Sequence, residues 1–323
     1  MSRELPITFA CGPYDRMEAL RSGDVKIDGV AITYRAIQPA PKIFREMIEK
    51  RAFDVAEMSL STHFIERSQG RFPFVAIPVF PSRVFRHGYI FITRNSRIAE
   101  PPDLNGKRIG LEGYKQTASV WIRGLLSEEY GVDLSRVHWL QGRLEKDDVV
   151  QGHTIEALPG VRIDPVPAGT SLSEMLVAGE LDAIIGPRTP SALAAGAVTR
   201  LFTNYRATEE DYFRRTGIFP IMHTLVIREE LHEEQPWLAR ALLEACVKSK
   251  LLALNQMRFS GAMRYMLPWL YDDIEEIDRL FDGDPWPYGV EPNRPALDAL
   301  ARYLLEQKLV PAPVACDHMF VAT

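Results

Sequence analysis

The sequence has few cysteines and no long apolar run. The three cysteines, Cys11, Cys246 and Cys316, lie far apart and match no metal-ligand spacing, which excludes a disulfide framework and predicts reduced thiols. No apolar stretch approaches the ~20 residues that a membrane span requires. The N-terminal residues lack the apolar core and cleavage site of a secretory signal. We therefore expect a cytoplasmic protein with no membrane partner.

The sequence also lacks an excess of positive charge. The formal net charge is -5 at pH 7, so the composition gives no reason to expect a nucleic-acid partner. The nucleophile elbow of hydrolases, the Walker loop, the dinucleotide-binding glycine motif and the zinc motif His-Glu-x-x-His are missing from the sequence. The histidines are scattered along the chain, and we predict no metal site.

What the sequence does contain is a basic turn between two apolar runs. Residues 74–80 and 89–93 look like buried strands, and Arg83, Arg86 and His87 lie between them. Guanidinium groups on an anchored loop are suited to binding a carboxylate or phosphate through paired hydrogen bonds. A solvated basic turn is the alternative interpretation. Aromatic residues interleaved with these cations favour the binding site.

The order of the expected elements predicts an α/β protein. Strands expected at residues 5–10, 30–37, 53–59 and 74–80 alternate with helical segments, which indicates a mainly parallel sheet. In such a sheet the ligand crevice lies outside the carboxyl ends of the strands, where Glu57, Ser59 and the basic turn would be found.

A second α/β unit is expected after residue 98. Its strands are predicted at residues 107–111, 137–140 and 181–185, with an irregular segment at 141–160. The segment from Glu180, Glu-Leu-Asp-Ala-Ile-Ile-Gly, resembles Ala-Phe-Asp-Val-Ala-Glu-Met from Ala52. The match indicates two lobes of related design, although one segment alone does not establish an internal repeat.

The last third of the chain is expected to be mostly helical. The amphipathic segments that predict these helices are residues 236–257, 263–271, 274–281 and 295–307. His223 precedes them inside an apolar run, where a lone histidine is more often a hydrogen-bonded core residue than a catalyst.

The loop before the helix expected at residues 118–129 is a second candidate site. A glycine-containing loop that leads from a strand into a helix can bind an anion through unpaired N–H groups and the helix dipole. Tyr114, Gln116 and Thr117 add polar side chains there. A plain strand-to-helix turn with Thr117 as the N-cap explains the same residues equally well.

Several motifs together resemble the 4,5-dihydroxyphthalate decarboxylase family. They include Phe-Asp-Val-Ala-Glu-Met-Ser ending at Ser59, Ala-Ile-Pro-Val-Phe-Pro-Ser-Arg-x-Phe-Arg-His ending at His87, Leu-x-Gly-Lys-Arg-Ile-Gly ending at Gly110, Thr-Gly-Ile-Phe-Pro-Ile-Met-His ending at His223, and Trp-Pro-Tyr-Gly ending at Gly289. The resemblance covers nearly the whole chain. It implies a fold similar to type II periplasmic solute-binding proteins, with a ligand cleft between two α/β lobes, one formed by residues 1–93 plus 201–323 and the other by the inserted residues 94–200.

The resemblance also implies the chemistry. A small aromatic di-acid such as 4,5-dihydroxyphthalate would lose one carboxylate as CO2 without an organic cofactor, and a proton would be delivered to the ring carbon. His87 is the preferred donor, and His223 is expected at a ring hydroxyl. Glu57 is expected either to accept the phenolic proton or to pair with an arginine. The remaining candidates bind substrate: Arg83, Arg86, Ser59, Tyr114, Gln116, Thr117 and Phe219.

Other functions are compatible with the same residues. A solute-binding protein for an aromatic or other small organic anion would use the same crevice without chemistry. A ligand-sensing module ranks last because the sequence has no attached DNA-binding segment. Self-association into a homo-oligomer is left open.

Overall fold

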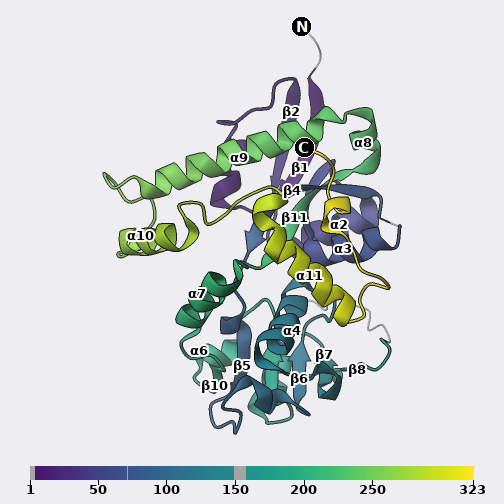
Figure 1. The fold of residues 1–323 in the computed structure, drawn as a ribbon, viewed down its shortest axis with the longest axis vertical. Coiled ribbons are helices and arrows are strands. Elements are labelled where there is room, and N and C mark those ends of the chain that lie inside the picture. Colours follow the sequence, from purple (N-terminus) through teal and green to yellow (C-terminus); the bar gives the residue numbers. More distant parts are fainter. Residues whose placement is uncertain (1–3, 71, 149–157) are drawn as a thin grey trace. The chain divides into compact units, whose positions relative to one another are not determined.

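The computed structural model describes residues 4–70, 72–148 and 158–323 and divides the chain into two compact units (Figure 1). Unit 1 consists of Met1–Arg83, Ile221–Leu297 and Ala315–Thr323, and unit 2 of Val84–Pro220 and Asp298–Val314. The lobe boundaries expected at residues 93 and 200 stay a prediction. Among the described residues, no helix is long and apolar enough to cross a membrane.

Unit 1 is built on a mixed sheet with the strand order β2-β1-β3-β11-β4. These strands are β2 (Val30–Ala36), β1 (Leu5–Cys11), β3 (Val55–Ser59), β11 (Ile221–Arg228) and β4 (Phe74–Arg83). β1 pairs in parallel with β2 and β3, whereas β11 is antiparallel to both β3 and β4. The α/β architecture is therefore confirmed, with one antiparallel strand inserted between β3 and β4.

Figure 1 shows the helices of unit 1 together with its strands. They are α1 (Glu18–Ser22), α2 (Ala40–Lys50), α3 (Leu60–Ser68), α8 (Glu229–Glu234), α9 (Trp237–Arg258) and α10 (Leu270–Phe281). The prediction of a helix at residues 263–271 is wrong, because α10 begins only at Leu270. Pro268 cannot donate a backbone hydrogen bond and disfavours helical geometry at Leu267, so the segment before it forms turns.

Unit 2 contains the second sheet, with the strand order β10-β5-β9-β6-β7-β8. The strands are β10 (Val198–Arg200), β5 (Ile90–Thr93), β9 (Ala183–Ile185), β6 (Arg108–Leu111), β7 (His138–Gln141) and β8 (Arg162–Pro165). β6 pairs in parallel with β7 and β9, and β5 is antiparallel to β9 and β10. The sequence pattern missed β8, and residues 149–157 of the expected irregular segment lie outside the described residues.

The helices of unit 2 are α4 (Thr117–Tyr130), α5 (Leu172–Val177), α6 (Ser191–Ala194) and α7 (Tyr205–Thr216). α11 (Arg294–Glu306) passes from unit 1 into unit 2 at residue 298. In unit 2 the ring of Trp121 on α4 packs edge-on against Tyr303 on α11, with ring centroids 5.6 Å apart. Gly124 on α4 lies directly against the same tyrosine ring.

We predict that Gly124→Ala destabilises the protein. A methyl group at Gly124 would overlap the ring of Tyr303, which cannot move aside as a flexible side chain would. Overpacking of this kind costs about 1–3 kcal/mol, which exceeds the stabilisation that alanine provides over glycine through its higher helix propensity. Urea unfolding should show a lower midpoint, whereas Ser127→Ala on the same helix should leave the midpoint nearly unchanged. An unchanged midpoint for Gly124→Ala would contradict the packing of α4 against Tyr303.

Candidate functional site

The candidate site of unit 1 lies where several strand ends meet at one edge of the sheet. Glu57 lies near the carboxyl end of β3, and Cys11 ends β1. β11 runs in the opposite direction, so its first residues reach the same edge, and His223 pairs with Ser59. The sheet topology therefore brings together a carboxylate and an imidazole that are separated by 166 residues of chain.

The carboxylate of Glu57 is fully buried and is surrounded by hydrogen-bond donors. Its Oε1 atom accepts from the Tyr14 hydroxyl at 2.7 Å and lies 2.6 Å from His223 Nδ1. Its Oε2 atom accepts from the backbone N–H of Gly12 at 2.9 Å and from the thiol of Cys11 at 3.5 Å. Both oxygens are thus occupied by groups of the protein.

These donors decide the ionisation state of Glu57. Burial opposes the charged form, but the hydrogen bond and charge of His223 and the donors from Gly12 and Tyr14 outweigh it, so the pKa of Glu57 lies below its usual value. Burial, and then the negative charge of Glu57, raise the pKa of Tyr14. Tyr14 therefore stays protonated and donates to an ionised carboxylate.

The ionised carboxylate fixes the orientation of His223. A carboxylate only accepts hydrogen bonds, so Nδ1 of His223 carries the proton that faces Glu57, which leaves Nε2 as the atom able to exchange a proton with a ligand. The edge of the His223 ring packs against Phe44 on α2, with centroids 4.9 Å apart. The side chain of His223 is 19% exposed, so a ligand can reach it.

A cavity adjoins Tyr14 in the same unit. It has a volume of about 230 Å³ and is lined by Gly12, Pro13, Tyr14, Ile37, Gln38, Pro39 and Ala40. The lining is mostly apolar and ends at the start of α2. Tyr14 thus belongs both to the wall of this cavity and to the hydrogen-bond network of Glu57.

The other unit 1 candidates have structural contacts. The Ser59 hydroxyl caps α3, because it accepts a hydrogen bond from the backbone N–H of Thr62. Arg83 is only 4% exposed and donates to the carbonyl of Pro287 at 2.6 Å and to the side chain of Asn293. Burial lowers the pKa of Arg83 to about 9. Substrate binding by Ser59 and Arg83 stays a prediction.

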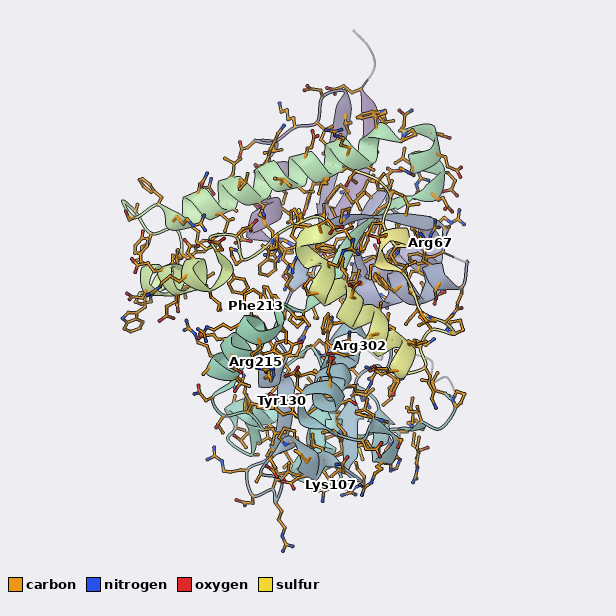
Figure 2. The ribbon with its side chains drawn as sticks, in the orientation of Figure 1. Arg67, Lys107, Tyr130, Phe213, Arg215 and Arg302 are labelled. Atoms are coloured by element: carbon orange, nitrogen blue, oxygen red, sulfur yellow. The ribbon has the colours of Figure 1, made fainter. Side chains whose placement is uncertain are left out.

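In unit 2, His87 lies in an aromatic environment. Its side chain is 1% exposed, and the rings of Tyr130, Phe202 and Tyr212 surround it (Figure 2 labels Tyr130). Burial lowers the pKa of His87 to about 4, so the ring is neutral near pH 7. The carboxylate of Glu209 accepts a hydrogen bond from the backbone N–H of Gly88 at 3.1 Å.

The remaining candidates also belong to unit 2. The backbone N–H of Tyr114 donates to Gln141 Oε1 at 2.8 Å, and its carbonyl accepts from Arg123 at 2.6 Å. α4 begins at Thr117 with Gln116 as the N-cap residue, so the alternative with Thr117 as the N-cap is wrong. Phe219 stacks on Phe85, with ring centroids 4.4 Å apart.

Two groups of candidates therefore result. Glu57, Ser59, Arg83 and His223 share one sheet edge of unit 1, whereas Arg86, His87, Tyr114, Gln116, Thr117 and Phe219 belong to unit 2.

Sequence reasoning missed Tyr14 and Gly12. The available signal was their position directly after the first strand, because parallel strands place the residues that follow them at the same edge as Glu57. In the described part of the chain, no group of three or more potential ligands could hold a metal ion.

Glu209 leads to a prediction about stability and pH. Burial raises the pKa of Glu209 to about 7, above its ordinary value near 4.5. The folded state therefore holds a proton that the unfolded chain releases, so this stabilising contribution is complete below about pH 4.5 and is lost as the pH rises through about 7. Between pH 5 and 7.5 we therefore expect the free energy of unfolding to fall by about 2 kcal/mol more in the wild type than in Glu209→Gln.

The measurement is urea unfolding at a series of pH values. Glu210→Gln is the matched control, since Glu210 is the neighbouring residue on α7 and is paired with Arg206 and Arg214 at the surface. Equal pH dependence of the wild type and Glu209→Gln would refute a buried, protonated Glu209.

Two relatives match the chain in sequence, and no family model matches it. A protein from Comamonas testosteroni named 4,5-dihydroxyphthalate decarboxylase is 37% identical over 316 residues, which cover 96% of each chain. A protein of the same name from Pseudomonas putida is 37% identical over 213 residues, which cover 65% of this chain and 82% of the relative.

Solved structures with a similar fold include two sulfonate-binding proteins. The periplasmic aliphatic sulphonate binding protein SsuA from Escherichia coli has a TM-score of 0.56 and 14% sequence identity, covering 99% of this chain and 98% of that one. The alkanesulfonate-binding protein SsuA from Xanthomonas axonopodis pv. citri has a TM-score of 0.52 and 12% identity, with coverages of 99% and 98%. At this identity the likeness concerns the fold, and it confirms the expected two-lobe α/β fold of the periplasmic-binding-protein type.

Proposed function

Because this chain belongs to the 4,5-dihydroxyphthalate decarboxylase family, we propose that it removes one carboxylate as CO2 from a hydroxylated aromatic di-acid and leaves a catechol carboxylate. The substrate is of the 4,5-dihydroxyphthalate kind, and the reaction belongs to the breakdown of aromatic compounds. A cytoplasmic location and the lack of a nucleic-acid or membrane partner stay predictions, and self-association stays open.

The observation that carries the proposed mechanism is the contact between His223 and the buried, ionised Glu57. In the reaction a proton is added to the ring carbon that bears the carboxylate. The bond from this carbon to the carboxylate then breaks, CO2 leaves, and its electron pair restores the aromatic ring. The para hydroxyl supplies electron density to the carbon that is protonated. A positioned general acid contributes a factor of about 10² to 10⁴ to such a step.

We assign the role of general acid to His223 and route the proton through its Nε2 atom. His223 is accessible, and the carboxylate at Nδ1 compensates the positive charge that the ring carries before it gives up the proton. His87, the donor preferred from sequence, is buried, and its lowered pKa of about 4 keeps it neutral near pH 7. A neutral, inaccessible imidazole is a poor proton donor, and we therefore propose His223 in its place.

Glu57 acts as a positioning residue in this mechanism. The carboxylate is buried and accepts hydrogen bonds from Gly12, Tyr14 and His223, so it does not face a ligand. Its role is to hold the imidazole in one orientation and one tautomer, as a carboxylate does for a catalytic histidine. The reaction as written moves only protons and the electrons of the substrate, and no organic cofactor forms part of the proposal.

We predict that His223→Asn lowers kcat and kcat/KM together by about 10² or more, because an interaction made only in the transition state is lost. The measurement is CO2 release and formation of dihydroxybenzoate from 4,5-dihydroxyphthalate. Phthalate, which lacks the hydroxyl groups, should still bind the variant. His138→Asn is the control, since His138 pairs with Asp164 at the surface of unit 2. Near-normal turnover by His223→Asn would remove His223 from the mechanism.

A second variant separates the role of Glu57. Glu57→Gln keeps the shape of the side chain but removes its charge, so kcat should fall about 10- to 100-fold with little change in KM. Nitrogen-15 NMR of the histidines should find the His223 proton on Nδ1 in the wild type and a mixture of tautomers in the variant. A wild-type proton on Nε2 would contradict the assignment. If the wild type binds 4,5-dihydroxyphthalate and phthalate but releases no CO2 from 4,5-dihydroxyphthalate, the protein is a solute-binding protein.

A further inference from the structure

Arg16 lies in an unusual environment next to the site of unit 1. Its guanidinium carbon is 4.3 Å from the ring centroid of Tyr14 and 4.3 Å from that of Trp286, so two aromatic rings pack against it. Its Nε and Nη2 atoms donate to the carbonyl of Pro81, and Nη1 lies 3.0 Å from Asp15 Oδ1. These contacts hold the guanidinium in one place.

Stacking of this kind restricts how an anion can approach. Two aromatic rings packed against the guanidinium leave fewer directions of approach, and a carboxylate pairs with a guanidinium along its edge. A guanidinium carries more N–H donors than Pro81 and Asp15 occupy. The side chain is 16% exposed, so its edge can be reached.

Tyr14 connects Arg16 to the proposed proton donor. The ring of Tyr14 packs against Arg16, and its hydroxyl donates to Glu57 Oε1, the same oxygen that contacts His223 Nδ1. One rigid side chain therefore sets the distance between the cation and the Glu57–His223 pair. Tyr14 also lines the cavity of about 230 Å³.

The other arginine candidate of this unit is less accessible. Arg83 is 4% exposed and directs Nη2 to the carbonyl of Pro287 and to Asn293. A ligand carboxylate would have to displace these acceptors. Arg16 is the more exposed of the two and lies against a residue of the site.

We propose that Arg16 is a specificity-determining residue that binds the carboxylate retained in the product. This inference rests on the proposed function for the identity of the substrate, a ring with two carboxylates of which one leaves. Arg16 holds the retained carboxylate, and the other carboxylate is thereby placed at His223. Arg16 accordingly makes the site prefer a di-acid over a mono-acid.

Asp15 opposes this binding. Its carboxylate pairs with Arg16 and compensates the charge of the guanidinium when no ligand is present. A ligand carboxylate must compete with it. Removing the charge of Asp15 should therefore strengthen the binding of a di-acid, an effect opposite in sign to the loss of Arg16.

The test compares two non-reactive probes, phthalate with two carboxylates and benzoate with one, by titration calorimetry. The wild type should bind phthalate about tenfold more tightly than benzoate, and Arg16→Gln should abolish this preference by weakening phthalate alone. Asp15→Asn should tighten phthalate binding about threefold. The matched control is Arg21→Gln, since Arg21 forms an ion pair with Glu18 on the surface of α1, with 2.6 Å between the charged atoms.

Two results would overturn the inference. One is equal weakening of phthalate and benzoate in Arg16→Gln, which would show that Arg16 merely supports the local structure. The other is weaker or unchanged phthalate binding in Asp15→Asn. If Arg16→Gln fails to fold, the measurement on Asp15→Asn tests the inference by itself. Because neither probe reacts, a wild type that does not decarboxylate 4,5-dihydroxyphthalate would defeat the proposed function while leaving the test of Arg16 intact.

Discussion

The buried charge of Glu57 is the constraint on which the candidate site depends. An isolated carboxylate in a protein interior is strongly destabilising, so it persists only where donors surround it. Here Gly12, Tyr14 and His223 supply them from different segments of unit 1. Satisfying one charge therefore fixes the turn after β1, the start of β11 and the orientation of an imidazole. The same network that offsets the cost of burial orients the imidazole that we propose as the proton donor.

The topology of the sheet explains why this network can form. Parallel strands bring their carboxyl ends to one edge, and an antiparallel strand inserted among them brings its first residues there too. β11 meets both requirements, since it lies between β3 and β4 and places His223 beside Ser59. We propose that a few side chains at a strand edge adapt a fold shared with sulfonate-binding proteins to proton transfer.

Much of the fold follows from the sequence, whereas the site follows only in part. Alternating apolar runs and turn residues correctly indicated the α/β fold and placed Glu57 near the carboxyl end of a strand. Local patterns carry no information on which distant strands become neighbours, so the contact between Glu57 and His223 needed the structure. Tyr14 was missed although its position directly after the first strand was a signal for this edge of the sheet. The prediction of a helix at residues 263–271 was wrong. The amphipathic spacing of this segment favours a helix, but Pro268 disfavours helical geometry at the residue before it.

The central claim is that this unit 1 site protonates a ring carbon as CO2 departs. The most direct test is incubation of the wild-type protein with 4,5-dihydroxyphthalate in D2O, followed by NMR of the product and measurement of CO2. The account predicts stoichiometric CO2 and a dihydroxybenzoate that carries deuterium at the carbon that lost its carboxylate. Saturable binding of 4,5-dihydroxyphthalate with no CO2 and no labelled product would contradict it.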